Sequence, residues 1–175
     1  RVNIIKMRGI KFRGGYHDYV LETGGIKMFP RLVAAEHSRD FELKIQPTGS
    51  AGIDLLLGGG LAAGTNTLIV GPSGIGKTSV SVCCLLSALE RGENASFYLF
   101  DEGLNTFFTR CASLNMDLRG YVATGQLRMH HIDPAELAPG EFAQMLRDSG
   151  EQDNVRFLVI DSLNAYMQAM PGEHF

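Results

Sequence analysis

Short apolar runs alternate along this chain with stretches in which apolar residues recur every three or four positions. The strand-like segments are residues 65–70, which end in the apolar run Leu68-Ile69-Val70, and residues 95–100, 127–132 and 157–160. The helix-like stretches are residues 79–90, 104–114 and 141–148. The run 157–160 is continuously apolar, which is typical of a strand covered on both faces, and the longer period is typical of amphipathic helices. Their alternation predicts an α/β fold with a mainly parallel sheet flanked by helices.

The first part of the chain has a different pattern. Residues 2–8 and 16–22 have β-type composition, and Gly24-Gly25 separates the second run from a third at 26–29. We expect a hairpin at this point, because both glycines tolerate a positive φ. Pro30 ends the third run by removing an N–H group from the ladder. Residues after it lack periodicity, which indicates a linker.

Composition changes this picture little. The chain has 175 residues, with 45% hydrophobic and 20% charged residues, which is ordinary for a globular domain. No run reaches the roughly 18 apolar residues of a membrane span, so we expect a cytoplasmic protein without a membrane segment. The first residue is Arg1, with no signal peptide after it, and the chain is interpreted as an excerpt of a longer protein. Its three cysteines show no C-x-x-C spacing, which favours reduced, packed thiols.

The net charge of −3 hides an asymmetry between the two parts of the chain. Residues 1–45 contain nine Lys/Arg and five Asp/Glu, and residues 46–175 contain seven and fourteen, giving +4 and −7. The acidic part argues against a nucleic-acid partner, because duplex-binding surfaces need clustered positive charge. The basic start is compatible with a phosphate ligand or with a solvated pair of strands.

Residues 71–78 match the P-loop pattern G-x-x-x-x-G-K-[ST] at every fixed position, between an apolar strand and a helix-like run. In this context, loop N–H groups and the helix N-terminus cradle phosphate oxygens. Lys77 is expected to reach the β- and γ-phosphates of ATP, and the Thr78 hydroxyl to ligate Mg²⁺. The expected nucleotide-binding residues are Gly71, Pro72, Ser73, Gly74, Ile75, Gly76, Lys77, Thr78 and Ser79.

Acidic residues follow two of the predicted strands. Asp161 ends the apolar run 157–160, at the sheet edge where such folds bind ligands, and is expected to hold the metal opposite Thr78. Asp101-Glu102 follows residues 95–100. This pair suits the orientation or deprotonation of a nucleophile, but an acidic turn or a helix N-cap explains it equally well. His130-His131 is interpreted as structural, because adjacent strand residues point to opposite faces.

These residues together resemble a known family. The span 52–60, Gly64, the P-loop, Asp101-Glu102 and residues 158–162 look like the KaiC branch of the RecA-like ATPases. The start of the chain strengthens the resemblance: residues 5–9, the hairpin and residues 25–30 resemble the end of a first KaiC domain and its linker into a second. The resemblance therefore covers nearly the whole chain.

The resemblance implies a domain organisation: residues 1–29 as the end of a first domain, 30–46 as a linker, and 47–175 as the N-terminal part of a second ATPase domain. It also implies a homo-hexameric ring that binds ATP and Mg²⁺ between subunits, protein partners, and in clock-type members Ser/Thr autokinase activity. Asp101-Glu102 occupy the place of a catalytic Glu pair. Lys6 and Arg8 match residues that act in trans on the neighbouring subunit's first-domain nucleotide.

Two departures from the family pattern affect what it implies. Asp101 is one methylene shorter than the expected Glu, so catalysis falls to Glu102 or is slower. The remaining sheet strands, including the one between the P-loop strand and the Asp161 strand, are expected after Phe175. We therefore expect an incomplete sheet in residues 1–175, which would not fold alone as a closed, active ATPase.

Three functions follow, in order of preference. The first is ATP hydrolysis in a ring-forming signalling protein, with Lys77, Asp101 and Glu102 as the catalytic groups. The second is a nucleic-acid-dependent RecA-like ATPase, which the acidic balance and the absence of an Arg/aromatic stripe disfavour. The third is a scaffold that binds ATP with little turnover, an alternative that the Asp101 departure leaves open.

Overall fold

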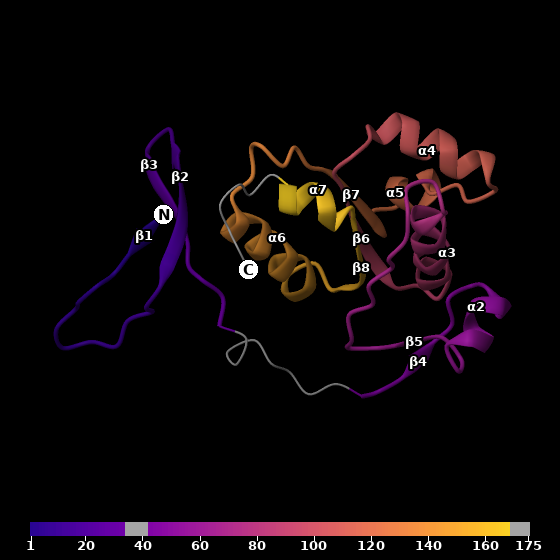
Figure 1. The fold of residues 1–175 in the computed structure, drawn as a ribbon, viewed down its shortest axis with the longest axis horizontal. Helices are drawn as coiled ribbons and strands as arrows, with labels where there is room; N and C mark the ends of the chain where they lie inside the picture. The colour runs from indigo at the N-terminus through magenta and orange to yellow at the C-terminus, as the bar shows by residue number, and fades with distance from the viewer. Residues whose placement is uncertain (34–41, 169–175) are drawn as a thin grey trace.

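A computed structural model describes residues 1–33 and 42–168 of the chain (Figure 1). Its centre is a three-stranded parallel sheet in the order β7-β6-β8. The strands are β6 (Asn94–Leu99), β7 (Leu127–His131) and β8 (Val155–Asp161). Strand β6 pairs with both neighbours, from Ala95 beside Leu127 on one side to Leu99 beside Asp161 on the other. The predicted α/β fold with a parallel sheet is confirmed.

Helices cover both faces of this sheet (Figure 1). Those of one face are α3 (Lys77–Glu90), α4 (Leu104–Ser113) and α5 (Arg119–Ala123). Those of the other are α6 (Pro139–Glu151) and α7 (Leu163–Gln168). The sequence predicted α3, α4 and α6 to within a few residues, but the short helices α5 and α7 were missed. None of the helices in the described residues combines the length and apolar composition needed to span a bilayer.

Residues of β6 and the residue after it pack alternately into two hydrophobic clusters, one on each face of the sheet. Phe97 and Leu99 pack with α3 and α4 in one cluster, and Tyr98 and Phe100 pack with α6 and α7 in the other. Side chains of a strand alternate between its faces, so a strand covered on both faces needs apolar residues at every position. This explains why residues 97–100 are apolar at every position instead of alternating between apolar and polar.

The N-terminal part forms a separate antiparallel sheet in the order β1-β2-β3. Its strands are β1 (Val2–Asn3), β2 (Tyr16–Glu22) and β3 (Gly25–Phe29). The predicted hairpin is present, with Glu22 beside Gly25 and positive φ at Gly24 and Gly25. The first strand is much shorter than the predicted 2–8. Ile5 is 89% exposed, so the residues after Asn3 have no packing surface that would hold them in a strand.

A small two-stranded sheet and a short helix precede the P-loop. Strand β4 (Ile45–Gln46) pairs antiparallel with β5 (Leu61–Ala62), and α2 (Ala51–Leu56) lies between them in sequence. The expected linker 30–46 therefore ends in a strand. Its residues 34–41 lie outside the described residues, as do residues 169–175 of the expected second domain.

The prediction of a strand at 65–70 is wrong for this structure. The backbone before the P-loop forms no ladder, and Leu68 and Val70 are 72% and 82% exposed. The neighbours of β6 are β7 and β8, and in residues 1–33 and 42–168 no strand lies along the outer edge of β8. A β-type segment needs a partner for its N–H and C=O groups, so the apolar pattern alone does not make residues 65–70 a strand.

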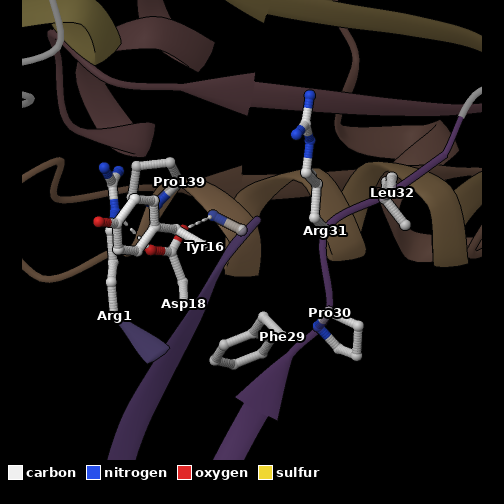
Figure 2. Close-up of a pocket in the computed structure, with 10 residues that line it drawn as sticks. Arg1, Tyr16, Asp18, Phe29, Pro30, Arg31, Leu32 and Pro139 are labelled. Atoms are coloured by element: carbon white, nitrogen blue, oxygen red, sulfur yellow. Dashed lines mark hydrogen bonds and ion pairs between the residues drawn. The ribbon is translucent and has the colours of Figure 1, made fainter. Parts of the chain in front are cut away.

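The hairpin docks on the N-terminus of α6. The Gly140 N–H donates to Asp18 Oδ2 at 2.7 Å, and the other Asp18 oxygen accepts from Arg1 Nε at 2.9 Å. Figure 2 shows Asp18, Arg1, Tyr16 and Pro139 together at one end of a pocket of about 350 Å³ between the hairpin and this helix. Asp18 thus supplies from a distant strand the carboxylate that a helix N-terminus favours.

We predict that Gly140→Ala weakens this docking. An added Cβ would lie 2.8 Å from Asp18 Oδ2 and 3.0 Å from Asp18 Cβ, so the carboxylate would have to leave the Gly140 N–H. The expected loss is about 1 kcal/mol, the usual value of a lost cap. Hydrogen exchange of the hairpin amides and thermal unfolding would measure it.

Gly150→Ala is the matched control in the same helix. No heavy atom lies within 4 Å of the Cβ it would add, so it should stabilise α6 slightly. Equal effects of the two substitutions would contradict the proposed steric conflict at Gly140.

Candidate nucleotide-binding site

The P-loop lies between the exposed residues 65–70 and helix α3. Gly74 and Gly76 have φ values of 79° and 99°, a region that glycine enters without steric cost. Gly76 is the residue before α3, which begins at Lys77, so the loop N–H groups and the N-terminus of α3 belong to one continuous turn. This is the local geometry that binds phosphate in P-loop proteins, and it follows from the glycine positions in the sequence.

Lys77 rests on its own loop. Its Nζ donates to the carbonyl oxygens of Gly71 and Pro72 at 3.0 and 2.9 Å. Carbonyl dipoles orient the ammonium group but leave its net charge uncompensated, unlike a carboxylate partner. Lys77 is therefore available to pair with an anion placed over the loop.

Thr78 and Asp161 meet although they are 83 residues apart in sequence. The Thr78 hydroxyl donates to Asp161 Oδ2 at 2.6 Å, joining the first turn of α3 to the end of β8. A hydroxyl and a carboxylate side by side are the hard oxygen ligands that Mg²⁺ prefers in proteins, and the donor set fits that ion. The structure therefore brings together the two residues that the sequence predicted as metal ligands.

The two acids after β6 have different partners. Asp101 Oδ2 accepts a hydrogen bond from Ser162 Oγ at 2.7 Å, and the Phe100 N–H donates to the Asp161 carbonyl at 2.8 Å. Asp101 thus lies close to Asp161, the expected metal ligand. The Glu102 carboxylate forms an ion pair with Arg110 of α4 instead.

The helix N-cap interpretation of Asp101-Glu102 is wrong. The N-cap of α4 is Gly103, and no side chain caps it. Two residues that contact these acids, Ser162 and Arg110, were not assigned a role by sequence reasoning. Ser162 follows Asp161 directly, and its position offered a signal, but Arg110 is eight residues from Glu102 and no short-range pattern links them.

Lys6 and Arg8 belong to the loop between β1 and β2, and Figure 1 shows this loop on the opposite side of the molecule from α3. Both side chains are exposed, on the long loop between β1 and β2 that extends away from α6. The structure does not bring them to the P-loop of their own chain. This arrangement is compatible with their expected role in trans, which stays a prediction.

The histidine pair lies on β7, away from the P-loop residues. His130 stacks on Tyr98 with ring centroids 4.5 Å apart, while His131 is exposed. Burial lowers the pKa of His130, with Arg128 adding to the effect. Within the described residues no group of three or more His, Cys, Asp or Glu side chains could hold a metal ion.

The cysteines are free thiols. Cys84 and Cys111 are buried and Cys83 is partly buried. Desolvation by burial raises the pKa of Cys84 to about 11, with the nearby Cys83 and Asp54 adding to the effect. This agrees with the expectation of packed, reduced thiols.

A parallel α/β sheet with a P-loop before α3 and acids at the carboxyl ends of β6 and β8 is typical of P-loop nucleotide-binding proteins. Residues 46–174 match the family described as "ATPase: KaiC". The chain belongs to the KaiC family of ATPases.

Several circadian clock proteins are similar to the chain. It is 24% identical over 174 residues to the circadian clock oscillator protein KaiC of Picosynechococcus sp., covering 99% of this chain and 34% of that protein. It is 36% identical over 98 residues to the circadian clock protein KaiC2 of Synechocystis sp., covering 55% of this chain and 17% of that protein. The chain thus spans about a third of the length of the KaiC oscillator proteins it matches.

We predict that lowering the pH from 7 to 5 destabilises the fold partly through His130. The pKa of His130 is lower in the folded protein than the value of about 6.5 that histidine has in the unfolded chain. Below about pH 6.5 the unfolded state therefore binds a proton at this residue more readily than the folded state does, and the free energy of unfolding declines as the pH falls. His130→Phe keeps the ring stacking and removes the titration. Thermal unfolding midpoints should depend less on pH in this variant, and the control His131→Asn should behave like the wild type. An unchanged pH dependence in His130→Phe would contradict the assignment.

Proposed function

We propose that this chain provides a nucleotide site of an ATP-hydrolysing ring protein of the KaiC type. The observation that carries the proposal is the Thr78–Asp161 hydrogen bond, 2.6 Å long, which places a P-loop hydroxyl and a strand-end carboxylate together. Lys77 adds a cation supported by carbonyl groups of the same loop. These groups suit a nucleotide triphosphate with its divalent ion.

Each side chain has a distinct task in the proposed reaction. Residues 71–76 and the α3 N-terminus hold the phosphate oxygens, and Lys77 moves from the loop carbonyls to the β- and γ-phosphates. Thr78 and Asp161 hold Mg²⁺, which when bound neutralises charge that develops on the phosphates. Asp101 and Glu102 are the candidates for orienting or deprotonating the attacking nucleophile.

The assembly proposal rests on the family. We propose a homo-hexamer with ATP bound between subunits, in which residues 1–29 end a first domain, 30–46 link the domains, and 47–175 begin a second. Lys6 and Arg8 would then compensate phosphate charge at the first-domain site of a neighbouring subunit. Their exposure on the β1–β2 loop supports this role. Ser/Thr autokinase activity and protein partners are further proposals, which rest on the family resemblance alone.

Lys77→Ala should lower ATP turnover by about a hundredfold and weaken ATP binding, because one preorganised cation is lost at the transferring phosphate. Phosphate release and equilibrium binding of ATP by the full-length protein would measure both effects. Lys27→Ala is the control, since Lys27 is an exposed hairpin residue paired with Glu22. ATP turnover in Lys77→Ala equal to that of the wild type would contradict the proposed site.

Thr78→Val should weaken the dependence of ATP binding on Mg²⁺, because it removes the hydroxyl that faces Asp161 while keeping the side-chain volume. Thr78→Ser restores the hydroxyl and should retain most of the Mg²⁺ effect. A titration of ATP affinity against Mg²⁺ concentration distinguishes the variants. The same Mg²⁺ dependence in Thr78→Val as in the wild type would exclude Thr78 as a ligand.

A further inference from the structure

The nucleotide site contains two adjacent acids whose side chains are held by different elements. Asp101 accepts from Ser162 Oγ at 2.7 Å, and Ser162 follows the residue that bonds to Thr78. Through Ser162, Asp101 is linked to the segment that carries the metal-side acid. Its position is therefore set by the end of β8.

Glu102 is held by α4. Its carboxylate pairs with the guanidinium of Arg110, in the last turn of that helix. The side chains of Glu102 and Arg110 are only 25% and 37% exposed. The pair therefore connects the last turn of α4 to the segment between β6 and this helix.

Arg110 is itself anchored. Its guanidinium lies over the ring of Phe107, 5.7 Å from the centroid, and this ring packs against Phe97 of β6 at 4.8 Å. Phe107 is fully buried, so the aromatic face that supports Arg110 is fixed by the core. Arg110 consequently offers Glu102 a cation in a defined place, not a mobile surface charge.

We propose that Arg110 is a positioning residue of the nucleotide site, which holds the Glu102 carboxylate on α4 and leaves Asp101 as the acid of the pair that stays beside Asp161. This inference rests on the proposed function, because it assigns separate roles to the two candidate catalytic acids. A second free carboxylate next to a polyanionic triphosphate would repel it, and the ion pair removes that repulsion.

A double-substitution cycle in the full-length protein tests this role. Arg110→Gln frees Glu102 and should raise the KM and the dissociation constant for ATP roughly threefold to tenfold, with a smaller change in kcat. In the Glu102→Gln background the same substitution should change both constants less than about twofold, because the charge that Arg110 restrains is gone. Arg110→Lys keeps the positive charge and should recover most of the wild-type affinity.

Arg119→Gln is the matched control. Arg119 also lies over a phenylalanine ring, 5.5 Å from the Phe108 centroid, and pairs with Asp117, but both of those charged side chains are more than half exposed. We expect its KM and kcat to equal those of the wild type. An equal loss in Arg119→Gln would show a general effect of removing an arginine from an aromatic face.

The outcomes separate the inference from the proposed function. If the wild type binds ATP but Arg110→Gln has the same effect with and without Glu102→Gln, Arg110 only stabilises α4 and the inference is overturned. An affinity unchanged by Arg110→Gln overturns it as well. If the wild type binds ATP without hydrolysing it, the ATP dissociation constants of Arg110→Gln with and without Glu102→Gln are sufficient to test the inference. If the wild type binds no ATP, the proposed function fails, and the inference with it.

Discussion

The burial of β6 on both faces is the constraint on which the rest of the structure depends. Because Phe97 and Leu99 face α3 and α4 while Tyr98 and Phe100 face α6 and α7, the strand is fixed from both sides. Its parallel pairing with β8 then places the residues after both strands at one edge. The acids Asp101 and Asp161 share that edge for this reason, and α3 brings Thr78 to them.

Local patterns in the sequence predicted the elements that are defined by the spacing of their own apolar residues or glycines. The strand-like segment 95–100, the stripe of α4 and the glycine spacing of the P-loop each have a direct structural counterpart. The residues 65–70 show the limit of this reasoning. Leu68-Ile69-Val70 is a continuous apolar run, but strand formation depends on a neighbour that supplies backbone partners, and composition contains no information about that neighbour.

The site was predictable in its residue types but not in its contacts. The P-loop spacing and a strand-end acid were enough to expect that Thr78 and Asp161 face each other. The Glu102–Arg110 pair and the capping of α6 by Asp18 join residues whose proximity follows from the packing of whole elements. No short-range rule links residue 18 to residue 140, since the contact exists only after the hairpin docks on α6.

The distribution of charge at the sheet edge explains why two of the acids can sit near a phosphate site. Lys77 is held by carbonyl oxygens, so its charge remains available to an anion, whereas the charge of Arg110 is used by Glu102. Asp161 has the Thr78 hydroxyl and Asp101 has the Ser162 hydroxyl as neutral donors. Neutral donors orient a carboxylate without cancelling its charge, which leaves Asp161 able to hold a divalent cation. The arrangement thus separates one acid that is paired with an arginine from two whose hydrogen-bond donors are neutral hydroxyls, and one of those two, Asp161, contacts the first turn of α3.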